Sequence, residues 1–376
     1  MRRVMVILII MSTIFTVGCW DMKDMNTRIY PYSVGLELND INDDRNLYTV
    51  NFTYPNIKSM GKNPESNDKV FIINEKARNL FEATHKLSVR NSDKMDLKHL
   101  KVLAISEGVA ENKKLLKEIL DGISRDFKIN KMVDLLMIEG SVEEFFQAKK
   151  DAKRQETTEG SIYSLLSNEQ DSTRFIPKSV SEFNEDMDYC KSAHMPIGKI
   201  SKDENIIAGA AVFKDYKLVG KLNMQENKYL SLLIDHVVDE GLDVEYEGDN
   251  LSLEVSRVKT KRELIESGDK IKIKITTKIS AQIHEYIMSN GHEINSEKEL
   301  EKMGKAIDKK IEYNMKKVID KIQQELNADI IGVYKYLNRY HPKLWKKVKD
   351  DWNEIFPKIE IEFDSDVNIR RRGLTT

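Results

Sequence analysis

Cysteine, proline and glycine are scarce in this chain of 376 residues, which contains 2, 7 and 17 of them. So few prolines and glycines exclude a fibrous or low-complexity protein. The two cysteines, Cys19 and Cys190, lie far apart, and Cys190 has no partner within the chain if Cys19 is modified. We therefore expect a fold held together by packing, with Cys190 as a structural or incidental thiol and not a reactive one.

The motifs of the common catalytic sites are also missing. No two of the seven histidines have the spacing that places two imidazoles on one helical face for zinc. His284-Glu285 and His292-Glu293 each begin such a motif without the second histidine, so we interpret both histidines as surface or satisfied residues. No glycine-rich phosphate loop, dinucleotide fingerprint or nucleophile elbow occurs. The sequence therefore predicts a protein that is not an enzyme and has no catalytic residue, cofactor or metal.

An excess of charge of one sign is lacking as well. The formal net charge is -2, and it becomes -4 (58 basic against 62 acidic residues) if residues 1–18 are removed with Arg2 and Arg3. This near balance gives no general attraction to nucleic acid. Beyond the N-terminus, no segment approaches the length of uncharged apolar sequence that a membrane span needs. With 40% hydrophobic residues, the length predicts two or three domains with real cores.

An export signal is present at the N-terminus. Arg2 and Arg3 precede the uncharged apolar run 4–17, which is shorter than the roughly 20 residues of a membrane span and typical of a signal peptide. The sequence Thr16-Val17-Gly18-Cys19 resembles a lipobox, with Thr16 where leucine is usual. We predict a lipoprotein signal peptide at 1–18 and a lipid on the Cys19 thiol, whose two acyl chains would hold the protein on a membrane. The alternatives are an uncleaved anchor or an ordinary secretory signal.

The pattern of residues 19–200 predicts an N-terminal α/β region, which we expect to contain two small subdomains. Alternation and apolar runs predict strands at 33–38, 46–54, 100–106 and 132–138. Helical stripes predict helices at 74–89, at 112–125 and from 141 onward. Residues 151–204 are the least periodic, so we interpret them as a connector with helical turns and a domain boundary near Pro196 and Gly198.

Residues 205–376 predict a C-terminal α+β domain. We expect a hairpin over 206–222, a helix at 227–236, strands at 251–258, 270–280 and 358–363, and helices at 297–326, 329–340 and 342–356. In the strand 270–280, isoleucines alternate with lysines, so its lysine face is either solvated or a contact for anionic lipid or a partner. The apolar stripe of 297–326 fits a helix on its own sheet or a coiled-coil partner. The predicted fold class is α+β and multi-domain, with mixed sheets packed by helices and, in the C-terminal domain, an antiparallel sheet with one long amphipathic helix.

Three blocks of residues together form a distinctive pattern along the chain. The longest runs from Asp329-Ile330-Ile331-Gly332 through Tyr336, Tyr340, Pro342 and Trp345 to Trp352-Asn353-Glu354-Ile355-Phe356-Pro357 and Ile369-Arg370-Arg371. The second is Ala211-Val212-Phe213-Lys214-Asp215 with Leu218-Val219-Gly220, and the third is Gly18-Cys19-Trp20-Asp21 followed by Gly35. With His99-Leu100-Lys101-Val102, these blocks resemble the Ger(x)C family of spore germination lipoproteins, and the resemblance covers essentially the whole chain.

The resemblance implies a non-enzymatic C-subunit of a nutrient germinant receptor, anchored on the outer face of the spore inner membrane. Its expected partners are two membrane-embedded subunits, one of them permease-like, and the family's fold is α+β in three domains. Only Cys19 carries over as a site residue, for lipid attachment. A solute-binding lipoprotein of an importer is the alternative, although it would need two similar lobes around a polar cleft. A cell-wall hydrolase is a third possibility.

Overall fold

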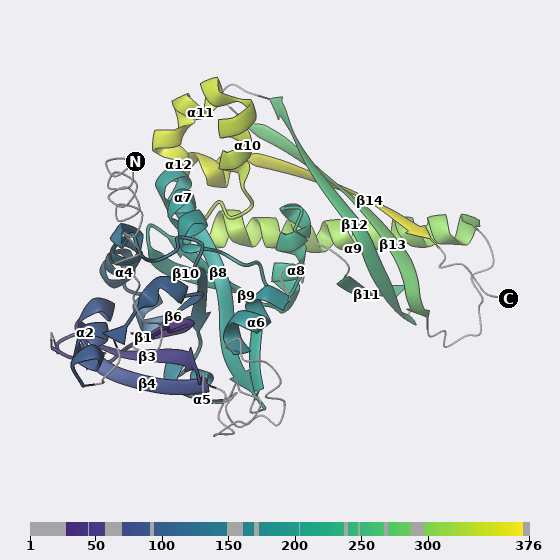
Figure 1. Ribbon diagram of the computed structural model, residues 1–376. Helices are drawn as coiled ribbons and strands as arrows, with labels where there is room; N and C mark the ends of the chain where they lie inside the picture. Colours follow the sequence, from purple (N-terminus) through teal and green to yellow (C-terminus); the bar gives the residue numbers. More distant parts are fainter. Residues whose placement is uncertain are drawn as a thin grey trace, which may run out of the picture.

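The computed structural model describes residues 28–43, 45–56, 70–90, 94–148, 161–168, 173–202, 204–236, 240–246, 249–266, 270–286 and 297–370. These residues form an eight-stranded sheet, a four-stranded sheet and a two-stranded pair. Helices pack against the larger sheet to form a body, and the four-stranded sheet extends away from it beside a long helix (Figure 1). The chain is an α+β protein of mixed sheets and helices, as the sequence predicts.

The eight-stranded sheet has the order β10-β9-β8-β7-β6-β2-β3-β4. Its strands are β2 (Ser33–Leu38), β3 (Tyr48–Pro55), β4 (Val70–Ala77), β6 (Val102–Ser106), β7 (Asp134–Ile138), β8 (Ser192–Ser201), β9 (Glu204–Lys214) and β10 (Lys217–Leu222). The four central strands run parallel, and the strands at both ends of the sheet pair antiparallel. The two-stranded pair, β1 (Arg28–Ile29) and β5 (Lys94–Met95), is parallel.

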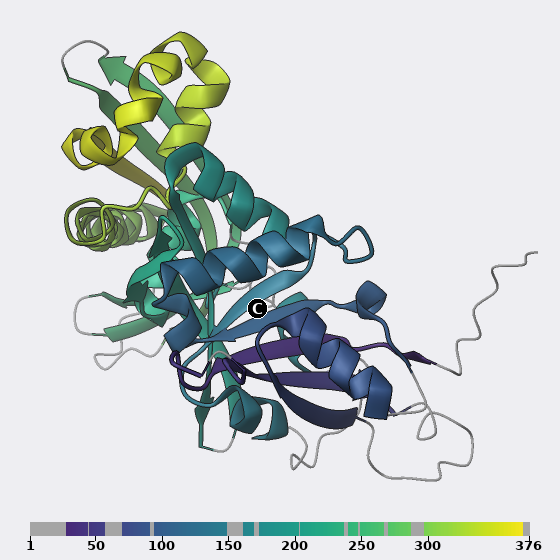
Figure 2. The same cartoon turned by 90° about the vertical axis from the view of Figure 1, so that its left-hand side faces the viewer.

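Helices cover both faces of this sheet, because its central strands are apolar on both sides. On β6, Leu103 and Ile105 join one core while Val102 and Ala104 join the other. The first core is closed by α2 (Leu80–Arg90), α4 (Lys113–Arg125) and α7 (Val180–Cys190), which face the viewer in Figure 2. The second is closed by α5 (Val142–Ala148) and α6 (Ser161–Asn168), while α3 (Glu107–Ala110) follows β6 directly. Helix α5 lies so close to β2 that a Cβ at Gly35 would collide with Val142 and Phe146.

The four-stranded sheet has the order β11-β12-β13-β14. Strands β11 (Glu240–Tyr246), β12 (Asp249–Glu266) and β13 (Lys272–Tyr286) are antiparallel, and β14 (Glu360–Arg370) is added parallel to β13. The long helix α9 (Glu297–Asp320) packs on this sheet and against β14. Its apolar stripe is buried in the same core as β13, so the interpretation as a core-facing helix is confirmed.

Carboxylates of α9 cover the outer edge of β14. Asp308 Oδ1 accepts the backbone N–H of Val367 at 2.9 Å, and Glu312 Oε1 accepts that of Ser365 at 3.0 Å. Asp308 also accepts the hydroxyl of Ser365 at 2.8 Å. Unpaired N–H groups on an edge strand can template pairing with another chain. The helix therefore protects this edge as well as the face of the sheet.

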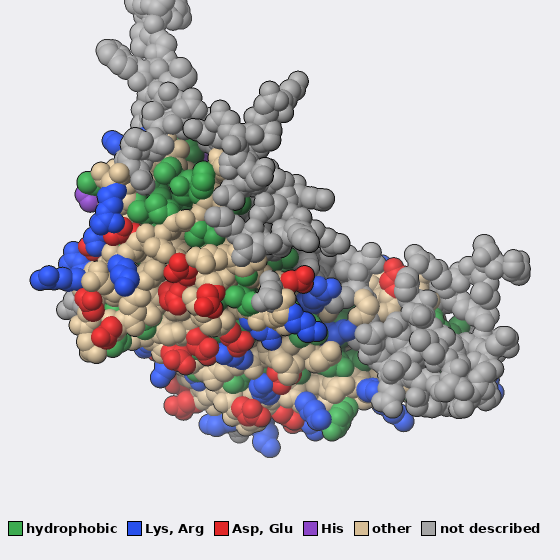
Figure 3. Space-filling model, turned by 90° about the horizontal axis from the view of Figure 1, so that it is seen from below, with side chains coloured by type: hydrophobic (Ala, Val, Ile, Leu, Met, Phe, Trp, Pro, Cys, Tyr) green, Lys and Arg blue, Asp and Glu red, His purple; other side chains and the backbone are tan. Residues whose placement is uncertain are grey.

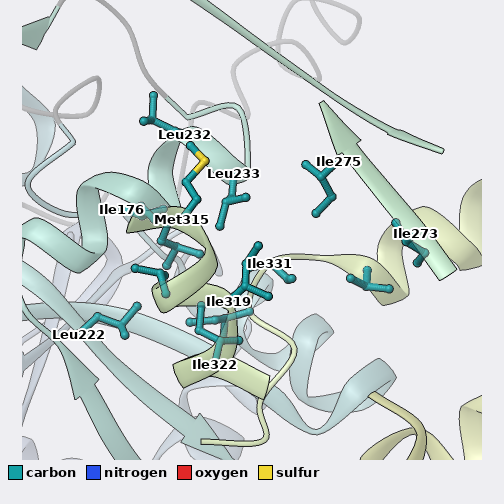
Figure 4. Packing of buried hydrophobic residues seen from close by; sticks show 14 of the residues in the cluster. Ile176, Leu222, Leu232, Leu233, Ile273, Ile275, Met315, Ile319, Ile322 and Ile331 are labelled. Atoms are coloured by element: carbon teal, nitrogen blue, oxygen red, sulfur yellow. The ribbon is translucent and has the colours of Figure 1, made fainter. Parts of the chain in front are cut away.

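The remaining elements join the two sheets through one core. They are α8 (Met224–Leu233), the π-helical turn η4 (Lys321–Glu325), α10 (Val333–Tyr340), α11 (Pro342–Val348), α12 (Trp352–Ile355) and the short 3-10 turns η5 (Lys349–Asp351) and η6 (Phe356–Lys358). The 3-10 turn η3 (Leu97–His99) belongs to the body instead, where Leu97 joins the core under α2, α4 and α7. Figure 4 shows residues of this cluster from several elements, among them Leu222 of β10, Leu232 of α8, Met315 of α9 and Ile275 of β13. On β9, Val212 faces this core and Phe213 faces the core under α7. The body and the four-stranded sheet are thus packed together through β9 and β10.

Four sequence-based assignments need correction. Residues 70–77 are a strand (β4), so the predicted helix 74–89 begins only at Leu80. Residues 192–201 are a strand (β8) of the large sheet, which the connector interpretation missed. The predicted helix 329–340 begins at Val333 because Gly332 has a positive φ of 76°. The predicted helix 342–356 is divided into α11, η5 and α12 before η6.

The large sheet also runs across the predicted domain boundary at 200–205, because β9 and β10 continue it beyond β8. That boundary stays a prediction. Seen from below, acidic and basic side chains are interspersed over the body, and hydrophobic side chains gather at its upper left (Figure 3). Among the described helices, none has both the length and the apolar character that a membrane crossing requires.

Candidate functional site at the junction of the two sheets

A cluster of charges around the buried Asp186 lies where α7 of the body meets α10. Asp186 on α7 accepts from Lys178 Nζ at 2.9 Å, from the Tyr334 hydroxyl at 2.5 Å and from Lys335 Nζ at 2.8 Å. We call these four residues the junction cluster. Lys178 comes from the segment before α7, whereas Tyr334 and Lys335 come from the first turn of α10. The cluster therefore ties together segments that lie far apart in the sequence.

Burial and neighbouring cations act in opposite directions on Asp186, whose exposure is only 6%. Burial raises its pKa, but Lys178 and Lys335, helped by the Tyr334 hydrogen bond, outweigh this and hold the pKa below the usual range. The carboxylate is ionised at neutral pH as a result. Buried ions are tolerated when each has partners, and removing one partner leaves a costly unpaired charge.

A second buried carboxylate, Asp329, fixes the start of α10. Its two oxygens accept the backbone N–H groups of Val333 at 3.0 Å and Tyr334 at 2.7 Å. These are among the first N–H groups of the helix, which have no partner within it. Burial nevertheless raises the pKa of Asp329 to about 6, against the effect of these hydrogen bonds and of Arg262. Asp329 therefore titrates close to physiological pH.

Arg262 on β12 connects the four-stranded sheet to the segment before α10. Its Nη2 donates to the backbone oxygens of Leu233 at 2.9 Å and Ile331 at 2.8 Å. Leu233 ends α8, and Ile331 lies in the segment between η4 and α10. One guanidinium thus holds a helix end and a loop against the C-terminal part of β12.

These groups line a cavity of about 850 Å³ between the body and the four-stranded sheet. His194 of β8 forms part of its wall and is 3% exposed, and neither of its ring nitrogens has a hydrogen-bond partner in the described part of the chain. Burial, and then the nearby Lys178, lowers the pKa of His194 well below its usual value. His194 is therefore neutral at physiological pH. The wall contains both signs of charge, including Arg339, Lys261 and Glu263.

The arrangement is suited to holding two parts of a protein together. The strongest charges of the site neutralise one another, and Asp329 is engaged by backbone N–H groups. Across the described ranges, no three His, Cys, Asp or Glu side chains converge as metal ligands would. The geometry of the site therefore serves to hold α7 and the start of α10 together.

Apart from the residues of the family resemblance, the residues that sequence reasoning singled out lie elsewhere, with one exception. Cys19, His292, Arg371 and Arg372 lie outside the described residues, and His284 and Arg370 lie on strands β13 and β14 with side chains that are not described. The exception is Cys190, which lies under the junction with an exposure of 1% and donates to the backbone oxygens of Asp186 and Ser192, both at 3.3 Å. Burial raises its pKa well above the usual value, which supports the interpretation as a structural thiol.

The lysine face of 270–278 is paired with acidic residues of the neighbouring strand. Lys272 contacts Glu360 at 3.1 Å and Glu362 at 2.7 Å, Lys274 contacts Asp364 at 2.5 Å and Lys278 contacts Asp366 at 3.2 Å. We call this set the lysine ladder. Because β14 supplies a carboxylate for each of these lysines, the ladder is internally neutralised and is a poor contact for anionic lipid.

The junction residues were missed because Lys178, Asp186 and His194 fall in the stretch 151–204, which has no clear periodicity. Asp329 and Gly332 lie in a block that carries the family resemblance, and this was the only available pointer to the site. A buried charge pair has no sequence signature of its own, because its partners come from distant segments.

Comparisons with known proteins are consistent along the whole chain. The family described as "Spore germination protein N-terminal domain" matches residues 21–200, and "Spore germination B3/GerAC like, C-terminal" matches residues 208–373. Spore germination protein B3 of Bacillus subtilis (strain 168) is 24% identical, over 95% of this chain and 94% of that protein. Spore germination protein A3 of the same organism is 22% identical, over 99% of this chain and 98% of its own length.

A solved structure has a similar fold. The crystal structure of the GerBC protein superimposes with a TM-score of 0.58 at 20% identity, covering 90% of this chain and 98% of that one. The likeness supports the multi-domain α+β fold described above.

Proposed function

Because the chain belongs to the Ger(x)C family of spore germination proteins, we propose that it is the lipid-anchored C-subunit of a nutrient germinant receptor. In this proposal it lies on the outer face of the spore inner membrane, held by a lipid on Cys19. It acts without catalysis, beside two membrane-embedded subunits, to trigger germination.

The observation that carries the proposal is the match of spore germination families to both halves of one chain. The junction supports it because the cluster around Asp186 and the shared core fix the body and the four-stranded sheet as one unit. A rigid unit of this kind presents surfaces to other subunits. The mutual neutralisation of its buried charges supports a non-enzymatic role.

Deletion of the gene tests the role in germination. Spores that lack the protein should lose the response to the nutrient of this receptor while still germinating with a non-nutrient trigger. An unchanged nutrient response, in a strain without a redundant receptor, would refute the proposal.

Cys19→Ala tests the anchor separately. We expect the variant protein to lose its lipid by mass spectrometry, to leave the membrane fraction and to abolish the nutrient response. Cys190→Ala is the matched control, because that thiol is buried and distant from the N-terminal segment in sequence. Normal germination with an unlipidated protein at wild-type abundance would show that the tether is dispensable.

A solute-binding lipoprotein of an importer remains the second candidate, because the cavity of about 850 Å³ lies between two structural units. Those units are dissimilar, however: one is an eight-stranded sheet with helices on both faces, and the other is a four-stranded sheet with one long helix. An importer protein needs two similar lobes. A nutrient that raises the melting temperature of the purified protein alone would favour this candidate.

A further inference from the structure

Three segments that precede parallel strands lie together along one edge of the eight-stranded sheet. Strands β2, β6 and β7 are parallel, and their first paired residues, Ser33, Val102 and Asp134, lie side by side. The segments that precede these strands, residues 28–32, 94–101 and 127–133, therefore all reach the sheet from the same side. Backbone hydrogen bonds join the segments directly, from Lys101 N to Tyr32 O and from Asp134 N to Lys101 O, both at 2.8 Å. We call these three segments the entry edge. In Figure 2, β1 and the loop that follows α4 both lie toward the right of the view.

Large apolar side chains are exposed on this edge. Phe127 is 88% exposed and Met132 is 62% exposed, and both lie in the loop between α4 and β7. Val89, at the end of α2, is 73% exposed and lies beside the edge, because the neighbouring Ser88 accepts the backbone N–H of Met95 at 3.1 Å. An exposed Phe or Met confers no stability on the fold itself. Gathered exposed apolar residues mark a surface that meets another apolar phase.

The three segments of the edge carry an excess of basic residues, although the chain as a whole is nearly neutral. They contain six Lys or Arg residues and one acidic residue, Asp96, which is paired with Arg28. Of these cations, Lys94, Lys98 and Lys128 are exposed. The aliphatic part of a lysine side chain can lie along an apolar surface while its ammonium group contacts a polar one. Three acids flank the edge in sequence, Asp93, Asp126 and Asp134, and Asp126 accepts the backbone N–H of Lys128 at 2.8 Å. The edge therefore has the composition of a surface that binds an anionic, partly apolar phase.

The length of chain before the edge selects the occupant. Nine residue steps separate Cys19 from Arg28, and an extended chain of that length spans at most ~30 Å. If Cys19 bears a lipid, Arg28 and the entry edge beside it must lie within this distance of the bilayer. Other parts of the molecule, such as the four-stranded sheet, have no such constraint.

We infer that the entry edge lies on the surface of an anionic lipid membrane, with Phe127 and Met132 in the headgroup region and Lys94, Lys98 and Lys128 against the phosphates. This inference rests on the proposed lipid anchor and goes beyond it by assigning a face. The two contributions are complementary: a lipid holds the chain at the membrane, and the basic apolar edge fixes its orientation.

An environment-sensitive dye tests the orientation in the full-length lipoprotein. Phe127→Cys and Met132→Cys are each labelled after reconstitution into vesicles of phosphatidylglycerol and phosphatidylcholine. Tyr313→Cys is the matched control, because Tyr313 is 61% exposed on α9, away from the edge. Cys190 is buried and does not compete for the label. We expect shorter-wavelength emission and quenching by spin-labelled lipids at 127 and 132, and a fully aqueous spectrum at 313.

Charge reversal sharpens the test. Each lysine near an anionic leaflet contributes roughly fivefold to association, so the combined Lys94→Glu, Lys98→Glu and Lys128→Glu variant should return the dye at 127 to an aqueous spectrum. Reversal of three exposed lysines of α9, Lys305, Lys309 and Lys316, should leave the spectrum unchanged.

The outcomes separate the two proposals. Dyes at 127 and 132 that stay aqueous, on protein whose lipid is verified by mass spectrometry, would overturn the membrane face and leave the anchor intact. Dyes that become shielded only when the membrane-embedded subunits are present would overturn it in favour of a protein contact. Absence of the lipid from Cys19 would overturn the anchor and the inference that rests on it together.

Discussion

The junction cluster and the lysine ladder use the same residue types to opposite effect. In the junction cluster, Asp186 and Lys178 are less than 10% exposed, whereas in the ladder Lys278 and Asp366 are 65% and 60% exposed. Water screens the exposed pairs and competes for their hydrogen bonds, so surface pairs add little to stability. The buried pair is not screened, and each ion depends on its partner. The comparison shows that burial, and not the number of ion pairs, decides which charges hold this molecule together.

Removal of the central carboxylate should give the largest effect. Asp186→Ala leaves Lys178 buried without a counterion, and we expect a loss of about 3–5 kcal/mol in the free energy of unfolding. Urea unfolding followed by tryptophan fluorescence is a suitable measurement, because Trp345 packs against Tyr334 at a centroid distance of 6.1 Å. Asp188→Ala, on an exposed position of the same helix, is the control and should change stability little. Equal losses of unfolding free energy in the two variants would contradict the conclusion that burial decides which charges stabilise the fold.

The titration of Asp329 should give the next largest effect. Its pKa is raised by burial from 3.8 to about 6, so the native state favours the protonated form. Stability from this group is therefore fully present below pH 4 and lost as the pH rises through 6. The difference corresponds to roughly 3 kcal/mol. Asp329→Asn should flatten the dependence of unfolding free energy on pH between 4 and 6.

Asp134 is the comparator for that experiment, because burial, and then Glu182, raises its pKa to about 6 as well. Asp134→Asn should remove a separate part of the same slope, and the double variant should remove both. A wild-type slope that persists in Asp329→Asn would show that the carboxylate at the start of α10 does not titrate in this range.

Changes in the ladder should give the smallest effect. The carboxylates Glu362 and Glu360 raise the pKa of Lys272, and Asp364 raises that of Lys274, so both lysines stay charged. Lys274→Ala should nevertheless leave the melting temperature unchanged within measurement error, because the pair is solvated. Added salt should weaken the attraction between the exposed charges of the ladder and leave that between the buried charges of the junction unchanged. A large drop in the melting temperature on Lys274→Ala would contradict the screening argument.

Regular periodicity is what made parts of this fold predictable from sequence. The alternation of Ile271, Ile273 and Ile275 with lysines identified β13, and the stripe of Met303, Ile307 and Ile311 identified α9, because each pattern extends over many residues. Residues 74–77 were assigned to a helix because the adjoining helix supplied a helical stripe. Their pairing with β3 depends on a partner strand that local sequence does not show.

The candidate site was less predictable than the fold. Strand β8 contains Pro196 and Gly198, which are typical of a boundary, yet it lies between β7 and β9 in the large sheet. The junction cluster unites residues up to 157 positions apart (Lys178 to Lys335), and its chemistry exists only once the chain has folded. Asp186 in isolation looks like any surface acid in an acidic helix.

The late position of β14 has a consequence for synthesis. The body closes with strands that follow one another between residues 28 and 222, so these strands can pair before the rest of the chain has been made. The second edge of β13 stays unpaired until residues 360–370 have been made. The contact between α9 and β14 likewise forms only then. During that interval the incomplete sheet exposes an unpaired strand edge, which favours aggregation. A frameshift before β14 would leave a folded body attached to an incomplete sheet, whose unpaired edge could pair with other chains.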